Sequence, residues 1–228
     1  MNISFLTVVL LLAIAITACS AQQEPASSSL ETTVIDATSQ LDKKQIRATF
    51  DGYRAAVLAN EGQQAASFVD SKTIQYYAGL LENTLTADST EIESLTLLDK
   101  VMVLMMRHRL PEEKLLSTNG KGLLVYALDE GMISKSSVEN NVLGQIEIIE
   151  EYANGEILVN NESSPVKFGF SKEDDKWLLD LTAVFPIGEI AFQKMVEDSN
   201  QAENDYLFFL LELIKGERPT AQIWQPIK

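Results

Sequence analysis

The sequence predicts an α+β domain in which several helices precede an antiparallel sheet. Apolar residues recur at helical spacing from Leu41 to Glu130, whereas they alternate with polar residues after about Val142. The alternating segments are short and are separated by turn residues, which indicates neighbouring antiparallel strands. Helical spacing returns at residues 187–196 and 205–214. Helices followed by strands are typical of the α+β class, here with additional C-terminal helices.

The helical half begins with a segment from Leu41 to Asn60 that has one apolar face. The residues on this face are Ile46, Phe50, Tyr53 and Val57. Further helices are expected at residues 63–68, 73–85, 91–109, 111–116 and 122–130. Asp70 or Ser71 is expected to cap the helix at 73–85. The segment 91–109 carries two neighbouring apolar stripes, so we expect one long and largely enclosed helix there.

The alternating half is predicted to form an antiparallel meander. Ile146 and Ile148 mark the first strand, and Asn154-Gly155 is a strong signal for the hairpin turn that follows it. The later strands are expected at residues 156–159, 166–170 and 177–185, with an acidic turn at 171–176 and with Pro186 ending the last strand.

Residues 1–18 are typical of a secretory signal peptide. An uncharged apolar run begins at Ile3 and ends at the small-residue junction Ile16-Thr17-Ala18-Cys19. As a helix the run would reach about 24 Å, which is shorter than the roughly 30 Å hydrocarbon core of a bilayer, so cleavage is favoured over a permanent span. The absence of Lys and Arg before this run is unusual, and it leaves an ordinary secretory signal and an uncleaved anchor as alternatives.

The junction resembles the lipobox of bacterial lipoproteins, in which an aliphatic residue, a tolerant position and a small residue precede a cysteine. The resemblance implies cleavage before Cys19 and a diacylglyceryl group on its thiol, which is the only soft nucleophile at this position. Two or more acyl chains would anchor the chain stably to a membrane. Ser20 follows, and not Asp, which resembles the sorting pattern for the outer membrane, facing the periplasm, in hosts that have two membranes.

The rest of the chain divides into a tether and a domain. Residues 19–40 are mostly small and polar, so we expect the lipidated Cys19 to be followed by a flexible tether. Residues 41–228 are enough for a single α+β domain. Cys19 is the only cysteine, so this domain forms no internal disulfide and its stability must come from packing.

The charge of the chain is strongly acidic. From position 41 onward the chain carries all 18 Lys and Arg residues and 30 of the 33 Asp and Glu residues, which gives a net charge of −12. Phosphate backbones would be repelled, so nucleic acid is excluded as a partner. The ordinary interpretation of this charge is solubility, in preference to a specific basic partner.

Three residues are candidates for chemistry in a pocket. His108 lies between Arg107 and Arg109 at the end of a predicted helix, where it could act as an acid or base or simply be favoured by the helix carboxyl end. Asp180 interrupts an apolar strand and could transfer protons if its face lines a pocket, or it could be a solvated or hydrogen-bonded strand residue. Tyr77 continues an apolar stripe, where its hydroxyl could orient a ligand or its ring could serve only as core.

Metal and cofactor sites are not expected. The sequence Glu173-Asp174-Asp175 lacks the alternating ligands and the glycine of a calcium loop. One histidine and one lipidated cysteine cannot form a zinc set. Asn119-Gly120-Lys121-Gly122 lacks the spacing of a phosphate-binding loop, and no Gly-x-Ser-x-Gly sequence is present.

The segment from about Leu41 to Phe185 is similar to the NTF2-like superfamily. The similarity lies in helices followed by a meander that contains Val166-Lys-Phe-Gly-Phe170, an acidic turn and Trp177-Leu-Leu-Asp-Leu181. It implies a curved sheet that wraps the helices into a cone with a pocket, used for catalysis by some members and only for binding by many. Two departures are a longer helical half and a C-terminal extension, whose end at Ile223-Trp-Gln-Pro226 could plug or cover the pocket.

These features lead to three hypotheses for function. The first is a non-catalytic pocket or interaction domain on a lipid anchor, with a small apolar ligand or an envelope protein as partner. The second is a small-molecule isomerase, cyclase or dehydratase that uses Asp180 with His108 or Tyr77. The third is an envelope scaffold that uses the apolar segment Tyr206–Leu211 as a contact with another protein or subunit. The alternative for this segment is a buried helix. The sequence does not decide whether the protein forms an oligomer.

Overall fold

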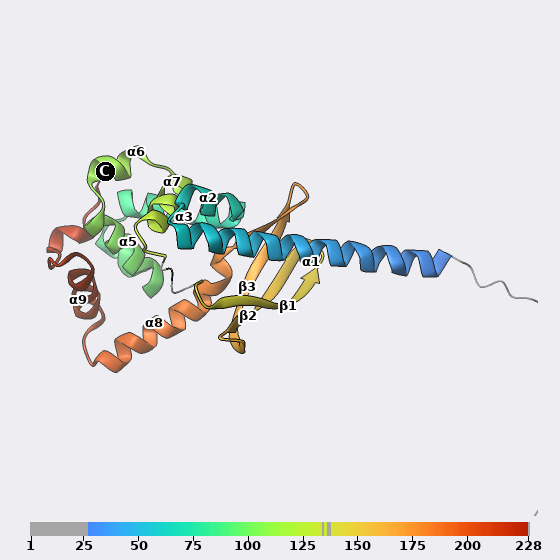
Figure 1. The fold of residues 1–228 in the computed structure, drawn as a ribbon. Coiled ribbons are helices and arrows are strands. Elements are labelled where there is room, and N and C mark those ends of the chain that lie inside the picture. The colour runs from blue at the N-terminus through green and yellow to red at the C-terminus, as the bar shows by residue number, and fades with distance from the viewer. Residues whose placement is uncertain (1–26, 134, 136–137, 228) are drawn as a thin grey trace, which may run out of the picture. The chain divides into compact units, whose positions relative to one another are not determined.

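A computed structural model describes the chain from Ser27 to Ile227, with the exception of positions 134, 136 and 137 (Figure 1). It separates into residues 1–37 and residues 38–228. The predicted signal peptide and the predicted lipidation site, Cys19, lie outside the described residues. The first helix, α1 (Ser27–Ala59), begins before the expected start at Leu41 and inside the predicted tether. No glycine or proline lies between Pro25 and Gly52 to interrupt a helix.

The domain formed by residues 38–228 has the predicted α+β order. Before the sheet lie α1, α2 (Gly62–Ala65), η1 (Ala66–Phe68), α3 (Ser71–Thr86), α4 (Ser89–Glu93), α5 (Leu97–Arg109), α6 (Glu112–Ser117) and α7 (Gly120–Asp129). After the sheet lie η3 (Leu181–Val184), α8 (Phe185–Ser199), α9 (Glu203–Lys215) and η4 (Ala221–Trp224). The predicted helices are confirmed, apart from the one expected at 91–109.

The expected single helix at 91–109 is wrong, because the chain breaks between α4 and α5. The Thr96 side chain accepts a hydrogen bond from the Asp99 amide and so caps a new helix. The Glu189 carboxylate of α8 accepts from the amides of Leu97 and Leu98, at 3.2 and 2.7 Å. These amides have no partner within α5, so the distant carboxylate stabilises a helix start at this point.

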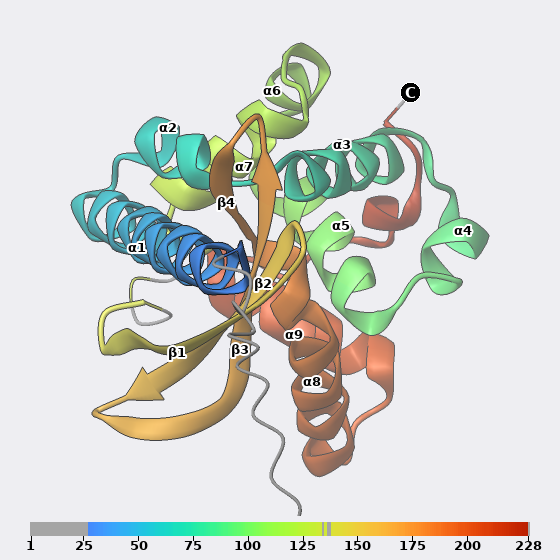
Figure 2. The same ribbon diagram turned by 90° about the vertical axis from the view of Figure 1, so that its right-hand side faces the viewer.

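The sheet is an antiparallel meander of β1 (Asn141–Ile149), β2 (Tyr152–Val159), β3 (Glu162–Glu173) and β4 (Lys176–Asp180), in that order across the sheet (Figure 2). The meander is confirmed, but the expected hairpin turn at Asn154-Gly155 is wrong. Ile149 pairs with Tyr152, which places the turn at Glu150 and Glu151.

Gly155 lies inside β2, at a position where two neighbouring side chains approach the backbone so closely that a larger residue would not fit. A Cβ atom at this position would lie 2.5 Å from Leu143 Cδ1 and 3.1 Å from Phe170 Cε2. This register also buries Ala153 and Ile157 on the same face of the sheet. Burial of one strand face therefore overrides the local preference of an Asn-Gly pair for a turn.

The last strand ends at Asp180 and not at Phe185, which corrects a second expectation. The Asp180 carboxylate accepts hydrogen bonds from the Thr182 amide at 2.8 Å and from the Thr182 hydroxyl at 2.6 Å, and it thereby caps η3. Pro186 lies in the first turn of α8, where its fixed φ angle suits a helix and its missing amide costs no hydrogen bond.

The part of α1 that belongs to this domain, residues 38–59, lies on the inner face of the sheet. All four residues of its predicted apolar face are at most 3% exposed. The ring centroids of Phe50 and Phe168 are 5.5 Å apart, and the Thr49 hydroxyl donates to the carbonyl of Trp177 at 2.6 Å. The Trp177 indole donates to the Asp42 carboxylate at 2.9 Å. Helix and sheet are therefore joined by hydrogen bonds as well as by apolar packing.

Helix α3 is joined to the end of β4. Its N-cap is Asp70, one of the two predicted caps, whose carboxylate accepts from the Thr73 amide and from the Ser171 hydroxyl. The Asp70 amide donates to the carbonyl of Leu179, and the Thr73 hydroxyl accepts from the Leu181 amide at 3.0 Å. Asp70 and Thr73 are both buried, so their polar groups are satisfied within the protein.

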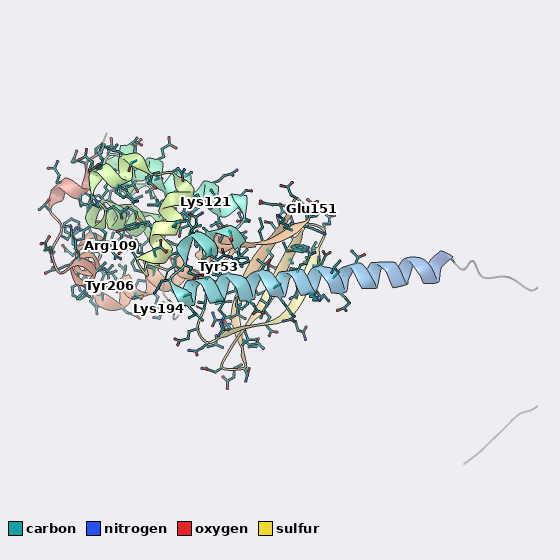
Figure 3. All side chains as sticks on the ribbon, turned by 45° about the horizontal axis from the view of Figure 1, so that its top comes forward. Tyr53, Arg109, Lys121, Glu151, Lys194 and Tyr206 are labelled. Atoms are coloured by element: carbon teal, nitrogen blue, oxygen red, sulfur yellow. The ribbon has the colours of Figure 1, made fainter. Side chains whose placement is uncertain are left out.

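Charged side chains extend outward from this domain. Glu151 at the β1–β2 turn, Lys121 on α7 and Lys194 on α8 are exposed (Figure 3). Lys100 is buried, as Asp70 is, and its ammonium lies between α4, α5 and α9. It donates to Glu93 at 2.8 Å and to Glu203 at 2.5 Å, and it thereby ties α9 to the helical half.

Candidate ligand-binding site

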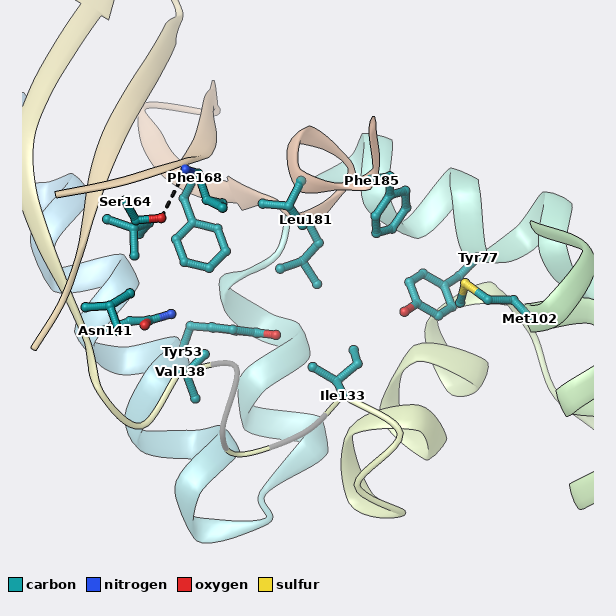
Figure 4. Close-up of a pocket in the computed structure, with 14 residues that line it drawn as sticks. Tyr53, Tyr77, Met102, Ile133, Val138, Asn141, Ser164, Phe168, Leu181 and Phe185 are labelled. Carbon is teal, nitrogen blue, oxygen red and sulfur yellow. Dashed lines mark hydrogen bonds between the residues drawn. The ribbon is translucent and has the colours of Figure 1, made fainter. Parts of the chain in front are cut away.

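A cavity of about 390 Å³ lies between the inner face of the sheet and the helices (Figure 4). This volume is at the lower end of the range for small-molecule sites. The described side chains that line it are all uncharged: Tyr53 of α1, Tyr77 of α3, Met102 of α5, Ile133 and Val138 of the α7–β1 connection, Asn141 of β1, Ile157 and Val159 of β2, Ser164, Val166 and Phe168 of β3, Leu181 and Val184 of η3, and Phe185 of α8.

Several sheet residues that face the cavity have short side chains. Val159, Ser164 and Val166 line it near the β2–β3 turn, and the bulkier Phe168 lines it further along β3. The Ser164 hydroxyl accepts a hydrogen bond from the Val166 amide at 3.1 Å, so this hydroxyl is bonded within its own strand. The wall formed by β3 is therefore largely apolar.

Two tyrosines are aimed into the cavity by threonines one helical turn earlier. Tyr53 follows Thr49 on α1, and Tyr77 follows Thr73 on α3, each at an i, i+4 spacing that places both side chains on one helix face. Thr49 bonds to the backbone of Trp177 and Thr73 to the backbone of Leu181. Contacts with β4 and with the start of η3 therefore fix the rotation of both helices about their axes.

The two tyrosine hydroxyls differ from other polar groups of the core because they face open space. Tyr53 and Tyr77 are 1% and 3% exposed, and their hydroxyl groups point toward one another across the cavity (Figure 4). Burial raises the pKa of both side chains, and the proximity of Tyr77 raises the pKa of Tyr53 further. Both phenols are therefore neutral hydrogen-bond donors at physiological pH.

The neighbouring Tyr76 plays a different part, because its hydroxyl is already bonded. It donates to the Asp99 carboxylate at 2.5 Å, and its ring packs against Phe185 with centroids 4.7 Å apart and edge-on against Tyr77 at 5.6 Å. Burial and the hydrogen bond to Asp99 raise its pKa. Tyr76 thereby supports two residues of the cavity wall without contributing a polar group to it.

The candidates Tyr77, Asp180 and His108 are not brought together. Only Tyr77 lines the cavity. Asp180 pairs with Lys72 at 2.8 Å in addition to capping η3. His108 lies at the end of α5, where its Nε2 is 2.9 Å from the carbonyl of Glu217. Burial and the charge of Lys215 lower the pKa of His108, which favours its neutral form.

The C-terminal segment does not cover the cavity, although the sequence suggests that it could. The amide of Ile227 donates to the carbonyl of Leu85, and the Arg107 guanidinium donates to the carbonyl of Ile223. The segment therefore lies against α3 and α5. The segment Tyr206–Leu211 lies in α9 and is buried on one face, since Tyr206, Leu207 and Leu211 are buried whereas Phe209 is 41% exposed.

Tyr53 is the cavity residue that the sequence did not single out as functional. Its place on the apolar face of α1 indicated core, and the face was correctly assigned. The sequence feature that could have indicated a function for Tyr53 is its hydroxyl, which is the only polar group on this stripe. A buried tyrosine needs a hydrogen-bond partner for its hydroxyl.

Within the described part of the chain, no group of three or more His, Cys, Asp or Glu residues could hold a metal ion. A search of the same residues finds no helix with both the length and the apolar character needed to cross a bilayer.

Comparisons with known proteins give no relative: no family model matches the chain, and no curated protein or solved structure is significantly similar to it.

The buried tyrosines predict a loss of stability at alkaline pH. Because the folded state raises the pKa of Tyr53 and Tyr77 above the ordinary value of 10.0, the unfolded chain loses these protons first. Their stabilising contribution is complete below about pH 10 and is lost as the pH rises through the folded-state values. Urea unfolding should show a falling free energy of unfolding above about pH 10, with a shallower fall in Tyr53→Phe and Tyr77→Phe, by up to about 1.4 kcal/mol per pH unit each.

Tyr152→Phe is the matched control for this titration, because Tyr152 is 68% exposed in the folded protein. This variant should keep the slope of the unmodified chain. Equal slopes in the unmodified protein and in all three variants would contradict the expected role of the buried phenols.

Proposed function

We propose that this chain is an exported lipoprotein whose single domain, residues 41–228, binds a small, uncharged and mainly apolar ligand without catalysing a reaction. In this proposal a lipid on Cys19 anchors the protein to a membrane, which is the periplasmic side of the outer membrane if the host has two membranes. The anchor rests on the lipobox-like junction Ile16-Thr17-Ala18-Cys19.

The observation that carries the binding function is the cavity with its uncharged lining. An apolar cavity of this size forgoes packing contacts that a filled core would gain, so its retention favours a binding role over a purely structural one. Ligand sites are commonly apolar pockets with a few polar groups, which describes this lining. A charged ligand would enter without a counter-charge, which is unfavourable.

We also propose that the domain is of the NTF2-like cone type. An antiparallel sheet with helices on its inner face, and a cavity between the two layers, supports this proposal. The enzymatic alternative is not favoured, because Asp180 and His108 do not line the cavity with Tyr77. The scaffold alternative is not favoured either, since Tyr206, Leu207 and Leu211 of the segment 206–211 are buried within the chain itself.

Lipid attachment is tested in a bacterial host that is fed radiolabelled palmitate. The full chain should incorporate label, and Cys19→Ala should lose it completely because no other residue at the junction is a thiol. Ser20→Ala is the matched control and should remain labelled. Label that persists in Cys19→Ala, or a mature protein whose mass shows a different first residue, would contradict the anchor.

Ligand binding is tested with the neutral fluorescent dye N-phenyl-1-naphthylamine. The dye should bind the protein saturably, and Val166→Phe should weaken its affinity at least about tenfold because the added ring enters the cavity. Val142→Phe is the control, since Val142 is exposed on β1 and does not line the cavity. Circular dichroism would verify that both variants are folded. Equal affinities in the two variants, or no saturable binding at all, would contradict the proposed function.

A further inference from the structure

The hydroxyl groups of Tyr53 and Tyr77 have no hydrogen-bond partner among the residues that the structure describes, although both side chains are almost fully buried. Other buried polar side chains of the same helices are satisfied. The Thr73 hydroxyl accepts from the Leu181 amide, and the Thr84 hydroxyl donates to the carbonyl of Leu80. The two phenols therefore differ from these threonines, and Gln45 Oε1, which is buried without a hydrogen-bond partner among the described residues, is a further exception.

A hydroxyl that faces an apolar cavity is unfavourable unless the cavity holds a hydrogen-bond partner for it, and two such hydroxyls in one cavity require an explanation. Phenylalanine would fill either position without this penalty, because the ring makes the packing contacts and the hydroxyl does not. Both hydroxyls point into the same space from different helices (Figure 4). The arrangement points to a single polar atom that lies between them when the cavity is occupied.

We propose that the cavity binds a neutral ligand through a carbonyl oxygen that accepts one hydrogen bond from Tyr53 and one from Tyr77. This assignment rests on the proposed binding function and specifies its ligand class. A carbonyl oxygen has two lone pairs in one plane, so it can accept from two donors that approach from opposite sides. A carboxylate is excluded from this class, because none of the described lining residues carries a positive charge.

The rest of the lining matches such a ligand. Beyond the two phenols, Phe168, Leu181 and Phe185 offer apolar and aromatic surface for a hydrocarbon body. Because Thr49 and Thr73 hold the two helices on the sheet, the donors are oriented before the ligand arrives, and binding needs little rearrangement.

The test compares two ligands of the same shape, 2-acetylnaphthalene and 2-isopropenylnaphthalene, in which a methylene group replaces the carbonyl oxygen. Their affinities are measured by displacement of N-phenyl-1-naphthylamine from the full-length protein. The ratio of ketone affinity to hydrocarbon affinity should fall at least about tenfold in Tyr53→Phe and in Tyr77→Phe, because each substitution removes one donor to the ketone and relieves one unpaired hydroxyl beside the hydrocarbon. Tyr126→Phe on α7, outside the cavity, should keep the ratio of the unmodified chain.

A second readout does not depend on affinity. The infrared carbonyl band of ¹³C-labelled 2-acetylnaphthalene should shift to lower frequency on binding, and each Tyr→Phe substitution should reverse part of that shift. The melting temperature should be unchanged or higher in both Phe variants, whereas a structural hydroxyl would lower it when removed.

The outcomes separate the two levels of the proposal. If both naphthalenes bind but their affinity ratio and the carbonyl band are the same in every variant, the carbonyl assignment is overturned and the apolar binding function stands. The carbonyl assignment is likewise overturned if the hydroxyls hold only an ordered water that the ketone does not displace. If neither naphthalene nor the dye binds the unmodified protein, the binding function itself fails.

Discussion

Two threonine hydroxyls hold the helical half on the sheet, because one bonds to the backbone near the start of the last strand and the other to the backbone of the residue that follows this strand. Thr49 of α1 donates to Trp177, and Thr73 of α3 accepts from Leu181. On its other side β4 forms only an isolated bridge with Val69, so this edge would otherwise expose unpaired backbone groups. The helices satisfy these groups in place of a fifth strand. The same contacts therefore cover the edge of the sheet and position the two tyrosines.

The cavity is tolerated because the domain is stabilised around it. Arg107 donates to the carbonyls of Asn83, Thr84 and Ala87, which end α3, and to that of Ile223 near the C-terminus. Lys100 similarly joins three helices through Glu93 and Glu203. A buried cation of this kind is favourable only when its hydrogen bonds are made, as they are here. These contacts fix the helices at the far side of the cavity from the sheet, so the space does not collapse.

The neutral lining decides what the site can do. The phenols of Tyr53 and Tyr77 remain protonated because burial raises their pKa, so they donate hydrogen bonds but do not act as bases near neutral pH. The predicted proton-transfer residue Asp180 does not line the cavity, and its carboxylate is occupied by Lys72 and by the start of η3. Recognition of a ligand is consequently better supported by this geometry than proton transfer.

The sequence predicted most elements of the fold because helical and alternating patterns directly reflect which faces are buried. It failed where contacts between distant segments decided the outcome. Glu189 stabilises a helix start at Leu97, far away in the sequence, and the register of β2 buries Gly155 despite its turn propensity. The strand predicted to reach Phe185 ends early because the Asp180 side chain begins a new helix.

The site was only half predictable for the same reason. Tyr77 was recognised as a candidate from its residue type and position, and it does line the cavity. Tyr53 has the same sequence signature as a core tyrosine. Only the packing of α1 and α3 on the sheet shows that its hydroxyl faces Tyr77 across an open space. Asp180 and His108 have the residue types of catalytic groups, but local hydrogen bonds and distance keep them out of the cavity.

The positioning of the tyrosines by the threonine contacts is tested most directly by a double-mutant cycle on the affinity for 2-acetylnaphthalene. Thr73→Val should weaken binding in the unmodified chain but add little in Tyr77→Phe, which gives a coupling free energy of at least about 1 kcal/mol. Thr73→Ser should restore binding, and Thr84→Val should show no coupling, since that hydroxyl bonds within α3. Additive effects of Thr73→Val and Tyr77→Phe, within about 0.3 kcal/mol, would contradict this positioning role.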